Sequence, residues 1–340
     1  KKVSSAEKSL NPYTLQAGMF GLDVVRIDLS SGARSELGVI PAFDARDAVE
    51  FEGRLFVATT DGLWACSLSG GPPTRIGERE LPSQYISSLA CVGRALYVGA
   101  GYDTEGSYFL KYSLEDMSMV NIASSERKQP RTPFDNISPG AFIRRIHPDE
   151  ERSRLVLVVD RGGDANNMND YQPLIGIWSY ALDSGTFTQH VHVNRRMWSG
   201  EVQDGRFLFS PYSGNPWQPG RMYRPWYGVL EYDMEKDACE FLCSFEGRPA
   251  GPDLNPQPST VSSGFKYLPP FYRQEGRLFF SAGSSVGWMD MPDATIYALP
   301  PPEPNQIFPL NNGRRLLMAN QKLVWWVDTE SVVADAPLKW

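Results

Sequence analysis

Residues 53–60 read GRLFVATT, and five close variants of this phrase occur further along the chain. The variants are GRALYVGA from Gly93, SRLVLVVD from Ser153, GRFLFSPY from Gly205, GRLFFSAG from Gly276 and GRRLLMAN from Gly313. Each begins with glycine or serine followed by arginine and continues with β-branched and aromatic residues, which is the pattern of a strand entered from a turn. Its recurrence at spacings of 37 to 71 residues indicates one structural unit that is used several times.

Other short segments recur around this phrase in a fixed order. An apolar segment precedes each copy, such as AVEFE at 48–52, SSLACV at 87–92, FIRRIH at 142–147, MWSGEV at 197–202, FKYLPPFY at 265–272 and QIFPL at 306–310. A second phrase follows, in CSLSGG from Cys66, YSLEDM from Tyr112, YALDSG from Tyr180, YDMEKD from Tyr232, YALPPP from Tyr297 and VDTESV from Val327. Further segments such as PTRIG from Pro73 and MVNIAS from Met119 come next. We interpret them as the first, third and fourth strands of a sheet whose second strand is the phrase.

This order predicts an all-β fold, a β-propeller of four-stranded antiparallel blades. Seven blades are favoured because a seventh third-strand phrase, IDLSSG from Ile27, precedes the six complete sets. Six blades are the alternative, with residues 22–29 completing the last one. In either case we expect N- and C-terminal strands to close the ring, because an open ring would leave sheet edges exposed. Residues 1–13 are predicted to be a tail and residues 14–340 a single domain.

Two segments carry a resemblance to a known family. LFVATTDGLWACSL at 55–68 and LPSQYISSLACVGRALYVGA at 81–100 resemble the propeller repeats of bacterial two-component-regulator type, found in periplasmic sensors. The resemblance implies the propeller fold and a periplasmic or extracellular location. It leaves the function open, because propeller repeats serve many activities.

Composition narrows the class of protein. The chain is 41% hydrophobic and 21% charged, as expected of a folded domain. We expect this domain to be a monomer. Its net charge of -7 argues against nucleic acid as a partner, because phosphate binding requires a clustered basic face. No run of 18 apolar residues is present, so no membrane span is expected. The first residues, KKVSSAEKSL, lack the apolar core of a signal peptide, as a mature secreted chain also would.

The connections predicted between strands are of two kinds. The loops from the first to the second strand and from the third to the fourth strand are short. Most loops from the second to the third strand, and from one blade to the next, are long. The long ones are 99–107, 124–140, 160–173, 210–226, 246–264 and 281–293. In an antiparallel blade they share one face, and long loops on a rigid scaffold often carry function. We therefore predict a ligand site on this face.

The richest of these loops supplies most of the predicted ligand-binding residues. They are Tyr212, Trp217, Arg221, Tyr223, Arg224 and Trp226, with Arg161 and Trp198 from neighbouring segments. Flat aromatic rings and hydrogen-bonding arginines suit a sugar, and the predicted partner is a glycan or a protein. The alternative is that the rings pack together to hold a long loop, which its four prolines also favour.

A second long loop gathers oxygen-bearing side chains. Asp160, Asp164, Asn166 and Asp170 could hold Ca²⁺, which prefers oxygen ligands. The segment departs from the EF-hand rule at Met168 and lacks the final glutamate, so a solvated turn is the alternative. No other cofactor is expected.

The sequence matches known catalytic motifs only in part. GSSVG at 283–287 matches the GxSxG pattern, but it is predicted to lie between antiparallel strands and no histidine follows it. His190 and His192 are predicted on an exposed strand face. Carboxylates such as Asp103, Glu105 and Asp135 could form a glycosidase pair only at a suitable separation. We therefore expect a non-catalytic binding module. The alternatives are a polysaccharide lyase or glycosidase with carboxylates and arginines at the central channel, and a structural interaction scaffold.

Overall fold

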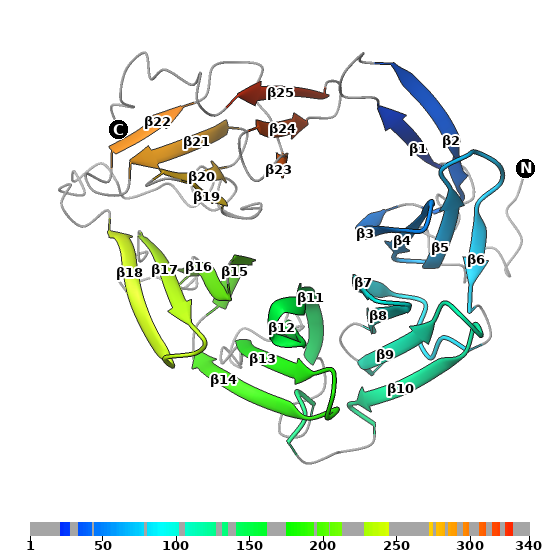
Figure 1. The fold of residues 1–340 in the computed structure, drawn as a ribbon, viewed down its shortest axis with the longest axis horizontal. Helices are drawn as coiled ribbons and strands as arrows, with labels where there is room; N and C mark the ends of the chain where they lie inside the picture. Colours follow the sequence, from blue (N-terminus) through cyan, green and yellow to red (C-terminus); the bar gives the residue numbers. More distant parts are fainter. Residues whose placement is uncertain are drawn as a thin grey trace, which may run out of the picture. The chain divides into compact units, whose positions relative to one another are not determined.

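Short antiparallel strands account for nearly all the regular structure in the computed structural model of this chain (Figure 1). The residues it describes are 21–27, 33–42, 44–77, 80–101, 106–126, 131–134, 141–161, 175–193, 196–203, 205–212, 228–244, 272–274, 277–282, 285–290, 295–298, 306–310, 315–319 and 324–328. The chain divides into two compact units, Lys1–His192 and Val193–Trp340, and each is considered by itself. No helix among the described residues has the length and apolar character needed to span a membrane.

The described residues of the first unit form one two-stranded sheet and three four-stranded sheets. The two-stranded sheet pairs β1 (Leu22–Ile27) with β2 (Arg34–Ile40). The first four-stranded sheet is β3 (Ala45–Phe51), β4 (Arg54–Thr59), β5 (Gly62–Ser67) and β6 (Thr74–Ile76). The second is β7 (Ile86–Val92), β8 (Ala95–Ala100), β9 (Tyr108–Ser113) and β10 (Met119–Ser124). The third is β11 (Ala141–Asp149), β12 (Arg154–Arg161), β13 (Ile175–Ala181) and β14 (Phe187–Val193).

The second unit repeats the same pattern. One four-stranded sheet is β15 (Arg196–Gln203), β16 (Arg206–Tyr212), β17 (Gly228–Asp233) and β18 (Ala238–Ser244). Another is β19 (Tyr272–Gln274), β20 (Arg277–Ala282), β21 (Ser285–Asp290) and β22 (Thr295–Ala298). The described part of the last sheet has three strands, β23 (Gln306–Leu310), β24 (Arg315–Ala319) and β25 (Val324–Asp328).

The recurring phrase forms the second strand of its sheet in all six cases, as predicted. These strands are β4, β8, β12, β16, β20 and β24, and each pairs antiparallel with the strands on either side. In the first unit their side chains are buried on both faces. Every residue of β8 is buried, as are residues 155–159 of β12. Burial on both faces explains why the phrase is a continuous apolar run and does not alternate with polar residues.

Two predictions about β19–β22 were wrong. Residues 281–293 were predicted to be a loop, but Ser285–Asp290 form the third strand, β21, which pairs with β20 from Arg277↔Asp290 to Ala282↔Ser285. Tyr297, assigned to the third strand, lies in the fourth strand, β22. Gly283, Ser284 and Ser285 resemble a loop, yet Val286, Trp288 and Met289 are of residue types that are found in strands. The first strand, β19, begins only at Tyr272, after two prolines that cannot donate to a ladder.

Apolar clusters join successive sheets of the first unit. Val24, Leu37 and Ile40 of the two-stranded sheet pack with Val57 and Cys66 of the first four-stranded sheet. A second cluster joins the first and second four-stranded sheets, and a third cluster joins the second and third. In the third cluster the rings of Tyr97, Phe109, Tyr180 and Phe187 lie 4.9–6.3 Å apart, in geometries typical of aromatic packing. The sheets of this unit therefore stack face to face.

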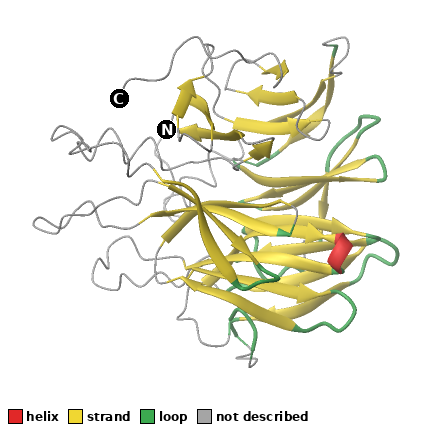
Figure 2. Cartoon of the chain, turned by 60° about the vertical axis from the view of Figure 1, so that its left-hand side comes forward, coloured by secondary structure: helices red, strands yellow, loops and turns green. Residues whose placement is uncertain are grey.

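The two ends of these sheets differ (Figure 2). At the end that we call the turn end, β3–β4, β7–β8 and β11–β12 are joined through residues 52–53, 93–94 and 150–153. Glu52 and Gly53 both have positive φ, which matches the tight turn preferred between twisted strands. The opposite end, where β3, β7 and β11 begin, is called the long-loop end. Most of the long connections predicted for this unit leave from it, although β4 and β5 are joined there by only two residues.

Candidate functional site

The first strands of the three four-stranded sheets lie next to one another in the first unit (Figure 1). β7 contacts β3 on one side and β11 on the other. Each of these strands begins at the long-loop end, so their opening residues meet there.

Each of the three strands carries a β-bulge close to its beginning. The register shifts between Ala45 and Asp47 in β3, between Ile86 and Ser88 in β7, and between Ile143 and Arg145 in β11. The extra residues are Arg46, Ser87 and Arg144. Bulges redirect side chains and are common next to binding and active sites. Their presence at the same place in three sheets makes them a repeated feature of the fold.

The second unit has a corresponding irregularity. In β15 the register shifts between Met197 and Gly200, which leaves Trp198 and Ser199 at the bulge. Trp198 therefore occupies, within its own sheet, the position that Arg46 and Arg144 occupy in theirs.

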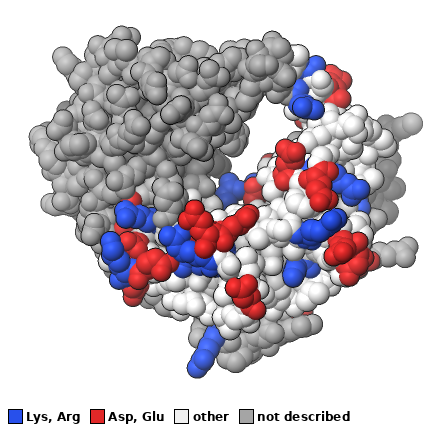
Figure 3. Space-filling view, in the orientation of Figure 1, with Lys and Arg blue, Asp and Glu red and all other residues white. Residues whose placement is uncertain are grey.

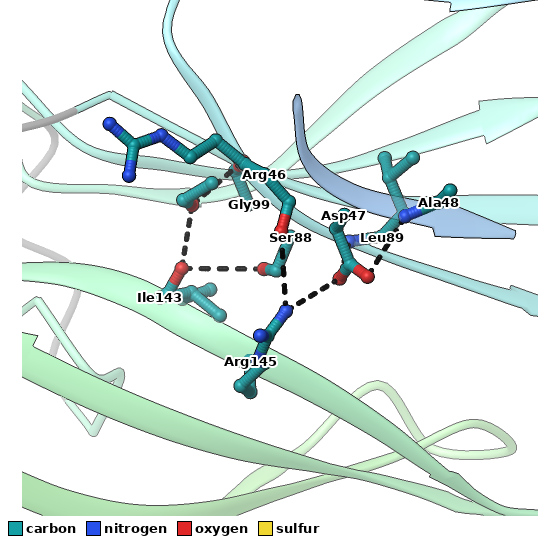
Figure 4. Close-up of polar contacts among 9 residues, drawn as sticks. Arg46, Asp47, Ala48, Ser88, Leu89, Gly99, Ile143 and Arg145 are labelled. Carbon is teal, nitrogen blue, oxygen red and sulfur yellow. Dashed lines mark hydrogen bonds and ion pairs between the residues drawn. The ribbon is translucent and has the colours of Figure 1, made fainter. Parts of the chain in front are cut away.

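A polar network links the bulged strands (Figure 4). Oδ2 of Asp47 in β3 accepts a hydrogen bond of 3.0 Å from the backbone N–H of Leu89 in β7. The same oxygen lies 3.5 Å from Nη1 of Arg145 in β11, and this Nη1 donates to the backbone carbonyl of Arg46 at 3.4 Å. Arg145 thus reaches from the third four-stranded sheet to the first, and the network ties three strands together.

Two serines of β7 add the next link. Ser87 Oγ donates to the Ile143 carbonyl at 2.6 Å and lies 3.0 Å from the Gly99 carbonyl, while Ser88 Oγ lies 3.3 Å from the Ile143 carbonyl. A Cβ on Gly99 would come within 2.6 Å of Ser88 Oγ, so glycine is needed for this approach. One edge of each first strand has no neighbouring strand in its own sheet, so backbone N–H and C=O groups on that edge need other partners. The side chains of Asp47, Ser87, Ser88 and Arg145 form hydrogen bonds with such groups. The network therefore stabilises the fold as well as presenting polar groups.

Arg46 extends from this network to solvent. Its Nη2 lies 3.1 Å from Oδ2 of Asp44, and about two fifths of each side chain is exposed. The guanidinium carbon lies 5.5 Å from the centroid of the Tyr85 ring, within the range of a cation–π contact. Arg145 is also 45% exposed. Two guanidinium groups, one from β3 and one from β11 on either side of β7, are thus held in place while remaining accessible.

The arginines and carboxylates of this site can bind polar ligands. A guanidinium group binds carboxylate or phosphate through two parallel hydrogen bonds, and Asp44 can accept from hydroxyl or amide donors. Among residues with described side chains, no three His, Cys, Asp or Glu residues gather as metal ligands. Opposite charges are also mixed on the face viewed in Figure 3, where acidic and basic side chains lie side by side over the described residues.

The predicted ligand-binding residues fall mainly outside the described residues. Trp217, Arg221, Tyr223, Arg224 and Trp226 belong to that group. Arg161 and Tyr212 are the last residues of β12 and β16, and Trp198 lies in β15, so only their backbone positions are described. Arg161 and Tyr212 end the second strands of their sheets, where these strands leave for the long loops. Ligand contact by these residues stays a prediction.

The calcium prediction is likewise untested. Asp160 lies in β12, and Asp164, Asn166 and Asp170 lie outside the described residues. Asp103, Glu105 and Asp135, the carboxylates considered for glycoside chemistry, are also outside them.

Two of the weaker catalytic candidates can be placed. Ser285 was predicted to lie between two strands, but it is the first residue of β21 and pairs with Ala282 of the antiparallel strand β20, so the parallel strand-to-helix elbow is not formed there. His190 was predicted on an exposed face, but it is half-buried and its Nε2 lies 2.8 Å from Ser179 Oγ.

Sequence reasoning missed Arg46, Asp47, Tyr85 and Arg145. They lie in or beside segments interpreted only as first strands. The sequence feature that could have indicated them is a group of charged residues near the start of a first strand, as in DARD at 44–47 and IRR at 143–145. No sequence pattern near Asp47 or Arg145 indicates that these two residues pair.

Comparisons with known proteins agree on the fold. No family model matches the sequence, and no curated protein matches it. The WD40 domain of Pan2 from Neurospora crassa has a TM-score of 0.53 at 7% identity, covering 89% of this chain and 80% of that one. The tricorn protease has a TM-score of 0.54 at 9% identity, and the match covers 95% of this chain but 33% of the protease. The extracellular domain of a one component system protein from B. thetaiotaomicron has a TM-score of 0.45 at 11% identity, covering 84% and 40%.

A WD40 domain is a β-propeller of four-stranded blades, and the sheets of this chain have the same antiparallel order. The chain therefore has a β-propeller fold. The number of blades and the closure of the ring stay predictions.

Proposed function

We propose that this chain is a non-catalytic β-propeller binding module that takes a glycan or protein ligand at the long-loop end of its first strands. The observation that supports this best is the repeated bulge in β3, β7 and β11, which groups accessible Arg46 and Arg145 with Asp44 and Asp47. Long loops on the same face would supply further contacts. The module would act as a monomer in the periplasm or outside the cell.

The loop after β16, in the second unit, is proposed to bind ligand through its own aromatic side chains. Its proposed contacts are Tyr212, Trp217, Arg221, Tyr223, Arg224 and Trp226, together with Arg161 and Trp198. Aromatic rings stack on the apolar face of a sugar, and arginines bond to the hydroxyls at its edge. These residues would add affinity without contributing to the blade core.

A glycan-array screen, with a thermal-shift panel of metals and sugars, tests the proposal. We expect Trp217→Ala and Trp226→Ala to abolish binding of the ligand found, while the melting temperature hardly changes. Phe207→Ala is the control, because Phe207 in β16 is fully buried and its truncation should cost about 3–5 kcal/mol. If the two tryptophan variants destabilise the protein as much as the control does, the loop serves packing.

A polysaccharide lyase or glycosidase is the second candidate, favoured by the meeting of carboxylates and arginines on the first strands. Hydrolysis needs two carboxylates with separate acid and base roles. Asp47 is already bound by the Leu89 N–H and by Arg145, which suits it to holding strands together. Release of new sugar ends from polysaccharides incubated with the protein would favour the enzyme.

A further inference from the structure

We propose that a row of polar side chains between β6 and β3 binds an uncharged oligosaccharide, so that the ligand is a neutral glycan. This inference rests on the proposed function and names the chemical class of its ligand. The row lies in the first unit and consists of Arg75, Gln84, Tyr85, Arg46 and Asp44, and we call it the polar row.

Contacts between neighbouring side chains make the polar row continuous. At one end, Nη2 of Arg75 donates a hydrogen bond to Oε1 of Gln84. At the other end, the guanidinium carbon of Arg46 lies 5.5 Å from the centroid of the Tyr85 ring, and its Nη2 lies 3.1 Å from Oδ2 of Asp44. Gln84 and Tyr85 are consecutive in the chain and join the two ends. The row therefore extends from the fourth strand of the first four-stranded sheet, β6, to its first strand, β3.

Arg75 is held in place before any ligand arrives. Its Nη2 also donates to the backbone carbonyl of Asp61, and its guanidinium carbon lies 5.8 Å from the centroid of the Trp64 ring. A Cβ on Gly62 would come within 2.9 Å of the Nε of Arg75, so glycine is needed for the guanidinium group to lie against the backbone here. Binding by a side chain that is already ordered costs less conformational entropy than binding by a free one.

The polar row is accessible from solvent. Gln84 is exposed, as are 42% of the Arg46 side chain and 41% of the Asp44 side chain, and the other two members are half-buried. The second and third strands of this sheet, β4 and β5, are joined at the same end by only two residues. A connection of that length is too short to cover the row, so this sheet offers an open place at the long-loop end.

Charges in and beside the polar row balance one another, which favours an uncharged ligand. Arg46 pairs with Asp44, and Arg75 bonds to Asp61, whose carboxylate supplies a second negative charge. Two arginines are thus accompanied by two aspartates. A charged ligand gains no net attraction from such a balanced place, yet it still loses part of its hydration on binding.

The hydrogen-bonding groups of the polar row match the hydroxyl groups of a sugar. Guanidinium groups only donate, the carboxylate of Asp44 only accepts, and the amide of Gln84 does both. Each sugar hydroxyl can donate and accept, so neighbouring hydroxyls can satisfy these groups in turn. A peptide carries fewer hydroxyl groups along its length. A row of several side chains therefore suits a chain of neutral sugar units.

Paired ligands test the inference without changing the protein. Hexamers of glucose, mannose, galactose and xylose are titrated calorimetrically at low and high salt, beside hexamers of galacturonate and glucosamine as charged arms and a Gly-Ser peptide. We expect at least one neutral hexamer to bind about tenfold more tightly than the charged hexamers and the peptide, with an affinity that salt hardly changes. No binding by any neutral hexamer, or tighter binding of a charged hexamer or of the peptide, would overturn the inference.

Matched variants locate the site. Gln84→Glu keeps the shape and the acceptor for Arg75 but removes the amide donors, so it should weaken binding of the neutral hexamer by about tenfold. Arg46→Lys keeps the charge but removes the planar group over the ring of Tyr85, and we expect a similar loss. Gln189→Glu is the control, because Gln189 is also exposed but lies in β14 of the third four-stranded sheet.

The control variant should bind as the unaltered protein does, and circular dichroism checks that all three variants fold. Equal affinity in all three would overturn the inference. A charged glycan or a protein that binds instead, in a manner that requires Trp217, would overturn the inference but leave the proposed function standing.

Discussion

Asp116 is a residue whose ionisation depends on contacts within its own turn. It lies in the turn between β9 and β10. Hydrogen bonds from Ser113 and then Ser118 lower the pKa of its carboxyl group from 3.8 to about 2. Ser118 donates to Oδ1 from its hydroxyl at 2.7 Å and from its backbone N–H at 3.1 Å. The folded turn therefore favours the carboxylate form.

The first prediction concerns this titration. A lowered pKa in the folded state means that Asp116 stabilises the fold above pH 3.8, and that its contribution is lost as the pH falls toward 2. NMR titration of the Asp116 carboxyl carbon should give a midpoint near 2, and Ser118→Ala should raise that midpoint. A midpoint near 3.8 in the unaltered protein would contradict the turn geometry.

At the scale of elements, the second strands could be predicted from sequence and the polar site could not. Burial on both faces makes residues 53–60 and their copies continuous apolar runs, which a local pattern reveals. β21 was missed because small residues at 283–285 resemble a loop, and only pairing with β20 shows the strand. The site depends on contacts such as Arg145 with Arg46, whose residues are 99 apart in sequence. No local pattern records such a contact.

The second prediction tests how β7 and β11 are joined. In Gly99→Ala the new Cβ would lie 2.6 Å from Ser88 Oγ, 3.0 Å from Ser87 Oγ and 3.1 Å from Ile143 Cβ. We expect a loss of about 1–3 kcal/mol in the free energy of unfolding, as is usual for overpacking. Adding Ser88→Ala removes the nearest atom and should restore part of this loss, which a double-mutant cycle in urea would measure. Additive effects of the two changes would show that the atoms are not in contact.

At the scale of the whole molecule, the third prediction is that the chain folds as one domain. Ring closure by N- and C-terminal strands would make the last strands necessary for every sheet. Deleting residues 316–340 removes most of β24 and all of β25. We expect this truncation to abolish soluble folding, judged by gel filtration and circular dichroism. A stable, monomeric truncated protein would contradict closure.

Hydrogen exchange can show whether a ligand binds the long-loop end of the first strands. Exchange is measured by mass spectrometry with and without the glycan that binds most tightly in the array. We expect slower exchange at 45–47, 86–88 and 143–145, where the bulges lie, and no change at the turns 52–53, 93–94 and 150–153. Slower exchange confined to those turns would place the ligand at the opposite end of the sheets, and binding at the long-loop end would then be wrong.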